Sequence, residues 1–172
     1  SNYKTVFFTL GILQIILGLS MIAPILAQFF YNELDSSFIS SGIVTIIFGV
    51  LFLLSNLDHD KKISLPQAFL LTALSWLSIA IFGSLPFIFS EIELSVTDAF
   101  FESMSGITTT GSTIITNLNE TPKSILLWRG MLQWLGGIGI IVMAITLMPL
   151  MNIGGMQSVS YTHLTLPTND QV

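Results

Sequence analysis

Cysteine is absent from this chain, and charged residues are scarce. None of the 172 residues is cysteine, and only 9% are Asp, Glu, Lys or Arg. The absence of cysteine excludes a disulfide framework and a thiolate metal site. Soluble globular chains carry about a quarter charged residues, so this composition argues against a water-soluble fold. Five Lys and Arg stand against ten Asp and Glu, and because phosphate binding needs clustered cations, nucleic acid is excluded as a partner.

Long apolar runs make up much of the sequence. Hydrophobic residues account for 52% of the chain, and the mean hydropathy is +0.81. About 20 apolar residues in a helix match the roughly 30 Å thickness of a bilayer's hydrocarbon core. Four stretches reach that length, of which the last is interrupted by Arg129: residues 6–30, 38–57, 68–89 and 124–150. The sequence therefore predicts an all-α integral membrane protein with four spans, in contact with the lipid bilayer.

The few lysines predict which way the spans run. Lys4 precedes the first span, and Lys61 and Lys62 lie between the second and the third. Because short cytoplasmic loops retain Lys and Arg, we assign both groups, and with them the N-terminus, to the cytoplasm. The other two connections carry acidic residues and are assigned to the outer face, where Lys123 is an exception.

A short apolar helix is predicted between the third and fourth spans. Residues 96–105 follow Ser95, which forms a capping box with Asp98, and Gly106 is placed as a stop. About ten residues are too few to cross a bilayer, yet the segment is too apolar for a solvated loop. We therefore predict a re-entrant half-helix that enters from the outer face and returns as the extended segment 107–115.

The returning segment is rich in uncharged oxygen atoms. Thr109, Thr110, Gly111 and Ser112 offer hydroxyls and successive carbonyls, and glycine permits backbone angles that turn several carbonyls to one side. Irregular backbone at membrane depth is tolerated where it lines a path, and there its carbonyls replace an ion's hydration shell. These four residues are therefore our candidate metal site, for a monovalent cation. The alternative is an ordinary Ser/Thr/Gly loop on the outer face.

Two strings in this region resemble a known family. They are "DAFFESMSGITTTGSTI", at residues 98–114, and "LLWRGMLQWLGGIGIIVMAITLMPLMNIGGMQ", at residues 126–157. Both resemble the first pore repeat of bacterial potassium uptake proteins of the TrkH/TrkG type, in the Trk/Ktr/HKT superfamily. The resemblance implies that potassium is the transported ion, that no organic cofactor is used, and that the location is the bacterial cell inner membrane. It also implies a homodimer and a cytoplasmic nucleotide-binding regulatory subunit as partners.

The same resemblance implies a domain organisation. Two N-terminal transmembrane helices, in residues 1–62, precede a first helix–pore loop–helix repeat, in residues 63–157, of a protein with four such repeats. Residues 109–112 are then selectivity-filter residues that hold potassium with their carbonyls. Since a filter needs about four such segments, we expect an N-terminal fragment that supplies one quarter of it. The polar tail of residues 158–172 does not resemble the family's continuation.

Arg129 is a charge inside the fourth span, and two positions are open to it. Its side chain can snorkel to the outer interface, with Trp128 as the neighbouring interfacial anchor. Alternatively, it can pair with Glu102 of the half-helix. We favour snorkelling. Three nearby glycines are assigned to close helix packing rather than to a hinge: Gly136, Gly137 and Gly139.

Three classes of function are compared. The leading hypothesis is potassium uptake, with residues 109–112 in the ion path. The second is a membrane scaffold or regulatory subunit with no ion pathway of its own. The third, an intramembrane enzyme, is disfavoured because the first three spans contain no Asp, Glu, Lys, Arg or His to act as acid or base.

Overall fold

The computed structural model describes residues 3–33 and 35–150. The chain divides into two compact units, Ser1–Ile138 and Gly139–Val172. The second unit is described only over residues 139–150, which form the end of helix α7 (Lys123–Leu150). The predicted tail, residues 158–172, lies outside the described residues.

Helices account for all four predicted spans. Four segments are long and apolar enough to cross a membrane: Lys4–Phe30, Ser37–Ser55, Leu65–Phe89 and Lys123–Pro149. The largest difference from the sequence prediction is at the start of the third, at residue 65 instead of 68. The four-span prediction is therefore confirmed. The helices that precede α6 are α1 (Lys4–Ser20), α2 (Ile22–Phe30), α3 (Ser37–Ser55), α4 (Leu65–Gly83) and α5 (Leu85–Phe89).

Two spans are each broken at a single residue. The first is interrupted at Met21 and the third at Ser84. Pro86 lies in the first turn of α5, where its missing N–H removes no helical hydrogen bond. The early start of α4 also has a local cause, because Ser64 and Gln67 form a reciprocal capping box. Hydropathy does not register such a polar start, and this is why the predicted span began too late.

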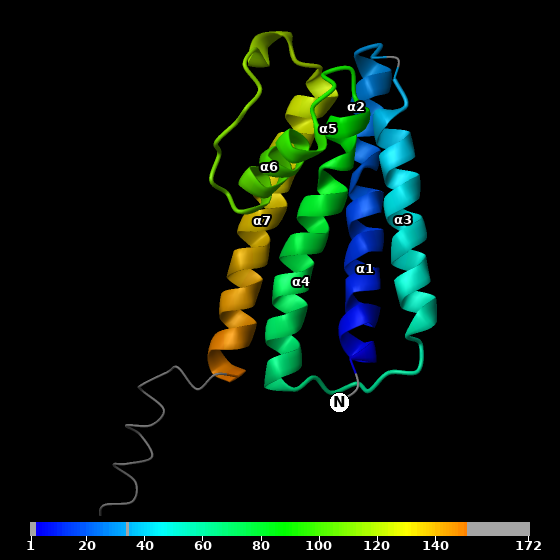
Figure 1. Cartoon of the computed structure of the whole chain (residues 1–172), viewed down its shortest axis with the longest axis vertical. Helices are drawn as coiled ribbons and strands as arrows, with labels where there is room; N and C mark the ends of the chain where they lie inside the picture. Colours follow the sequence, from blue (N-terminus) through cyan, green and yellow to red (C-terminus); the bar gives the residue numbers. More distant parts are fainter. Residues whose placement is uncertain (1–2, 34, 151–172) are drawn as a thin grey trace, which may run out of the picture. The chain divides into compact units, whose positions relative to one another are not determined.

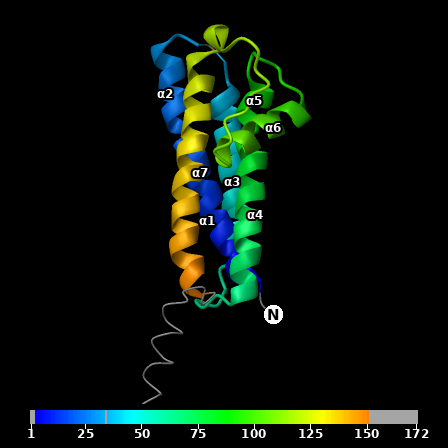
Figure 2. The same ribbon diagram turned by 90° about the vertical axis from the view of Figure 1, so that its left-hand side faces the viewer.

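Helices α1 and α3 run antiparallel and side by side (Figures 1 and 2), and glycines set how closely they approach. A Cβ on Gly11 would lie 2.7 Å from the carbonyl oxygen of Gly49. A Cβ on Gly18 would lie 2.5 Å from Cγ1 of Ile46. Lipid tails are as apolar as the helices, so helices in a membrane associate through close packing. The absence of side chains at these glycines is what permits that packing.

Trp128 of α7 belongs to the buried core. Its side chain is fully buried, and its ring packs edge-on against Phe38 of α3, with 6.0 Å between ring centroids. Its Nε1–H donates a 2.9 Å hydrogen bond to the carbonyl of Gly83, at the end of α4. The prediction of an interfacial anchor is therefore wrong, because the indole N–H finds a backbone partner inside the protein instead of at the lipid headgroups.

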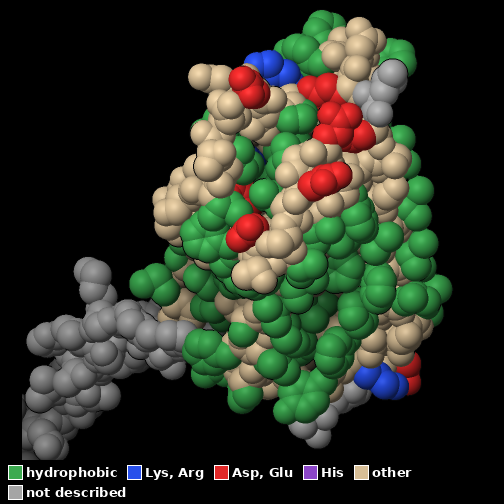
Figure 3. Space-filling view, turned by 45° about the horizontal axis from the view of Figure 1, so that its top comes forward, with side chains coloured by type: hydrophobic (Ala, Val, Ile, Leu, Met, Phe, Trp, Pro, Cys, Tyr) green, Lys and Arg blue, Asp and Glu red, His purple; other side chains and the backbone are tan. Residues whose placement is uncertain are grey.

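Charged side chains concentrate toward the ends of the first unit. The start of α1 and the α3–α4 connection, which carries Lys61 and Lys62, lie at one end (Figures 1 and 2). The α2–α3 connection, the α5–α6 connection and the short helix η1 (Leu118–Glu120) lie at the other. Figure 3 shows acidic side chains gathered toward this second end, above a wide hydrophobic surface. The lysines used to orient the chain therefore share one end, as the sequence required.

Candidate functional site

The predicted half-helix is present as α6 (Val96–Ile107). Ser95 begins it, and its Oγ accepts the N–H of Asp98 at 3.2 Å. The helix ends two residues later than predicted, because Gly106 lies inside it and is not a stop. Gly106 instead allows close packing, since a Cβ there would lie 3.1 Å from Cβ of Leu132 on α7. Twelve helical residues rise about 18 Å, roughly half of a bilayer's hydrocarbon thickness.

A non-helical return segment, residues 108–117, follows α6 and leads back toward η1 (Figure 1). Its backbone is left-handed at two positions, Thr109 with φ 59° and Gly111 with φ 82°. The N–H groups of Thr110 and Gly111 both point to the carbonyl of Ser105, at 3.0 Å and 3.4 Å. The carbonyls of residues 108–111 accept no hydrogen bond from the part of the chain that the structure describes. Residues 108–113 are also exposed as whole residues.

The sequence predicted one of the two left-handed positions. Gly111 was selected because glycine adopts positive φ without steric cost. Thr109 carried no such signal, because a β-branched residue rarely adopts positive φ. Alternation of φ sign along 108–111 turns successive peptide planes, an arrangement that a straight strand does not give.

Glu102 of α6 is the polar centre of this region. Its side chain is 1% exposed, and its Oε1 accepts a 2.6 Å ion-paired hydrogen bond from Nε of Arg129. Oε1 also accepts the hydroxyl of Thr113 at 2.8 Å, and Oε2 accepts the N–H of Ile114 at 3.1 Å. One carboxylate thus joins α6, α7 and the return segment.

The ion pair corrects the favoured position of Arg129. The Arg129 side chain is 18% exposed and reaches Glu102, so it does not snorkel. Removing one member of a buried ion pair typically costs about 3–5 kcal/mol, because the other charge is left without a partner. Sequence hydropathy gives the span but not the depth or direction of one side chain, which is why both positions stayed open.

Ser105 makes a second connection between α6 and the return segment. Its hydroxyl donates a 2.6 Å hydrogen bond to the carbonyl of Ser112. Of the four candidate residues, Ser112 therefore has its carbonyl engaged by the helix, whereas the carbonyls of Thr109, Thr110 and Gly111 are free of such contacts within the described ranges.

One stripe of α7 supports this arrangement from behind. Arg129, Leu132, Gln133 and Gly136 are spaced by three or four residues, which places them on one helix face. A Cβ on Gly136 would lie only 1.8 Å from the carbonyl oxygen of Ile107, and a Cβ on Gly111 would lie 3.9 Å from Nε2 of Gln133. Gly136 thus serves close packing, as predicted. The same prediction is wrong for Gly137 and Gly139 within the described residues, since a Cβ on either would meet no atom within 4 Å.

Glu33 positions the start of α7 from the α2–α3 connection. Its carboxylate accepts the N–H of Lys123 at 2.6 Å and the N–H and hydroxyl of Ser124 at 3.2 Å and 2.5 Å. A carboxylate at a helix N-terminus satisfies unpaired N–H groups and complements the helix dipole. Sequence reasoning missed this contact because the residues are 90 or more positions apart.

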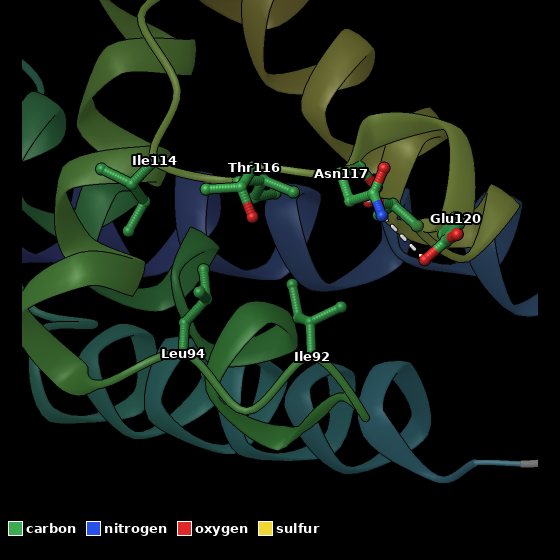
Figure 4. Close-up of a pocket in the computed structure, with 8 residues that line it drawn as sticks. Ile92, Leu94, Ile114, Thr116, Asn117 and Glu120 are labelled. Carbon is green, nitrogen blue, oxygen red and sulfur yellow. Dashed lines mark hydrogen bonds between the residues drawn. The ribbon is translucent and has the colours of Figure 1, made fainter.

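A pocket of about 280 Å³ lies beside the return segment, apart from the candidate residues (Figure 4). Ile92 and Leu94 form one wall, and the far part of the return segment, with η1, forms the other. Asn117 donates a 2.8 Å hydrogen bond to Glu120 at its edge. None of residues 109–112 lines this pocket. Within residues 3–33 and 35–150, no three His, Cys, Asp or Glu side chains converge as metal ligands.

Comparison with known proteins gives consistent matches. The model of the TrkH family, described as cation transport protein, matches residues 34–164. The Trk system potassium uptake protein TrkH of Vibrio parahaemolyticus is 38% identical over 158 residues, which cover 91% of this chain and 33% of that protein. An uncharacterized cation transporter of Methanocaldococcus jannaschii is 40% identical over 135 residues, which cover 78% of this chain and 28% of that one.

The fold is shared with a solved structure. The crystal structure of the potassium transporter TrkH from Vibrio parahaemolyticus matches with a TM-score of 0.85 and 35% sequence identity, covering 96% of this chain and 38% of that one. Four membrane-length helices in this fold define a multi-pass membrane protein. The chain belongs to the TrkH family of cation transport proteins, which are not enzymes. It spans about a third of the length of the curated relatives it matches.

Proposed function

We propose that this chain takes part in potassium uptake and supplies one quarter of a selectivity filter. The observation that carries the proposal is the set of carbonyls at the exposed residues 109–111, which follow a half-length helix and have no hydrogen-bond donor within the described ranges. Carbonyl oxygens arranged in this way replace the hydration shell of a monovalent cation. The C-terminal end of α6, with its partial negative charge, lies directly before them.

About four such segments complete a filter, so the remaining ones come from outside this chain. The relatives extend well beyond the matched third, which supports a longer transporter as their source. In that protein Ser112 completes the candidate set, with its carbonyl held by Ser105. The homodimer and the cytoplasmic nucleotide-binding regulatory subunit belong to the same proposal and rest on the family resemblance.

The proposed setting is the bacterial cell inner membrane, with the N-terminus in the cytoplasm. The clustering of Lys4, Lys61 and Lys62 at one end supports this direction, because cytoplasmic loops retain cations. The half-helix then enters from the outer face, and its C-terminal end lies partway across the bilayer.

The test is potassium uptake by the full-length transporter, expressed in cells that lack other uptake systems. Gly111→Val places a β-branched side chain at φ 82°, a conformation it rarely adopts, and we expect uptake to be lost. Gly130→Val is the matched control, because a Cβ at Gly130 meets no atom within 4 Å, and uptake should persist. Wild-type uptake in Gly111→Val would remove the filter assignment.

The alternative function is a scaffold or regulatory subunit whose return segment is a solvated loop. The exposure of residues 108–113 in this chain favours it. Single cysteines placed along residues 105–116 of the full-length protein distinguish the two functions. A solvated loop labels uniformly with a water-soluble thiol reagent, whereas a narrow filter labels mainly at its outer end.

A further inference from the structure

One face of α6 holds the return segment at the candidate filter residues and directly after them. The carbonyl of Ser105 accepts N–H groups from Thr110 and Gly111, and its hydroxyl binds the carbonyl of Ser112. One turn earlier, Glu102 accepts the hydroxyl of Thr113 and the N–H of Ile114. The free carbonyls of residues 109–111 therefore lie on a short arch whose outgoing limb is fixed by Glu102.

Glu102 differs from Ser105 in reaching a third element. Its carboxylate is nearly inaccessible to solvent and is bound by Arg129 of α7, so these hydrogen bonds are not exchanged with bulk water. Hydrogen bonds to an ionised acceptor are shorter and roughly twice as strong as neutral ones. The carboxylate thus fixes the limb relative to α7 as well as α6, and α7 is the helix whose Gln133 lies against Gly111.

We propose that Glu102 is a positioning residue that sets the preference of the path for potassium over sodium. The proposal rests on the proposed function. Sodium is the smaller ion, so carbonyls that move inward bind it better, and carbonyls held in place do not follow it. By fixing Thr113 and Ile114, immediately after the candidate residues, Glu102 prevents the arch from contracting.

Thr113→Val in the full-length transporter is the first test. It removes the hydroxyl that donates to Oε1 and also accepts the N–H of Ile115, and it leaves the ion pair with Arg129 in place. We expect the ratio of potassium to sodium uptake to fall about tenfold, the order of effect of one charge-assisted hydrogen bond. Glu102→Gln replaces one of the two acceptor oxygens, which serve Thr113 and Ile114, with an amide NH2 group, and it should lower the ratio at least as much. The double variant should show no further fall, because both changes release the same limb.

Two further variants separate positioning from folding. Thr116→Val makes the same substitution in the same segment, at an exposed residue whose hydroxyl has no hydrogen-bond partner within the described ranges, and should keep the wild-type ratio. Glu102→Gln combined with Arg129→Gln removes both charges. Compared with either single variant, this double variant should restore the amount of protein in the membrane. It should not restore the ratio of potassium to sodium uptake.

Several results would overturn the proposal. They are a wild-type ratio in Thr113→Val, an equal fall in Thr116→Val, or a ratio restored by the charge-free double variant. Thr113→Val decides alone if Glu102→Gln does not accumulate in the membrane. Potassium uptake by the wild type, and its loss in Gly111→Val, are measured in the same cells. If these fail, the proposed function fails with this inference; if they hold and the ratios do not change, only the inference is overturned.

Discussion

The α1–α3 pair and the α6–α7 region both depend on glycine, but they use it for different ends. Between α1 and α3, Gly11 and Gly49 bring two regular helices into backbone contact. Between α6 and α7, Gly136 admits the carbonyl of Ile107. Beyond that point the backbone is irregular, and the carbonyls of residues 109–111 accept no hydrogen bond from the described residues. A pair of regular helices needs only close packing, whereas a segment that must leave oxygens unpaired has to be held by buried polar side chains behind it.

The sharpest test of this difference is Gly136→Ala. A Cβ would lie 1.8 Å from a backbone oxygen, so α6 or α7 must move, and we expect destabilisation above about 3 kcal/mol, the upper end of the overpacking range. Potassium uptake by the full-length protein should be abolished. The measurements are thermal unfolding in detergent and uptake in cells.

Gly137→Ala is the neighbouring control for that variant. A Cβ there meets no atom within 4 Å, so stability and uptake should stay close to wild type. If both glycines tolerate alanine equally, the close contact between α7 and Ile107 is not required for stability or uptake. The α6–α7 region then does not differ from the α1–α3 pair in the way described.

Gly11→Ala tests the helix pair, with a smaller expected effect. Its Cβ would lie 2.7 Å from the Gly49 carbonyl. Because α1 and α3 can move slightly apart, we expect the free energy of unfolding to fall by about 1–3 kcal/mol. Thermal unfolding should report this loss, while the ratio of potassium to sodium uptake should be unchanged because the contact lies outside the return segment. Gly130→Ala, where a Cβ meets open space, is the control. A changed ratio in Gly11→Ala would show that the two regions are not independent.

Trp128→Phe should have the smallest effect. It keeps an aromatic ring beside Phe38 and removes the hydrogen bond to Gly83, so the expected cost is about 1 kcal/mol. Trp134→Phe is the matched control, since Trp134 is 67% exposed. Equal melting temperatures for these two variants would mean that the indole N–H contributes nothing to joining α4 and α7.

Local patterns predicted more of this molecule than long-range contacts did. Hydropathy located the spans, Ser95 marked the start of α6, and Gly111 was chosen for its backbone freedom, because each signal lies within a few neighbouring residues. The left-handed Thr109 was missed, since its conformation is imposed by the surrounding hydrogen bonds and not by its own preference.

Burial and pairing were harder to predict. Trp128 was placed at the interface because the sequence does not show that its N–H meets Gly83, 45 positions away. For the same reason the sequence left two places for the Arg129 side chain, the outer interface or an ion pair. The structure shows the ion pair with the buried carboxylate of Glu102. The site assignment at residues 109–112 remains a prediction that the uptake and labelling experiments test.

Glu33 bears on the order in which the chain is made. Residue 33 leaves the ribosome well before residue 123 is added to the chain. The Glu33 carboxylate, which accepts the first N–H groups of α7, is therefore present when that helix is synthesised. The α2–α3 connection thereby offers a partner to the start of α7 as soon as that helix is made.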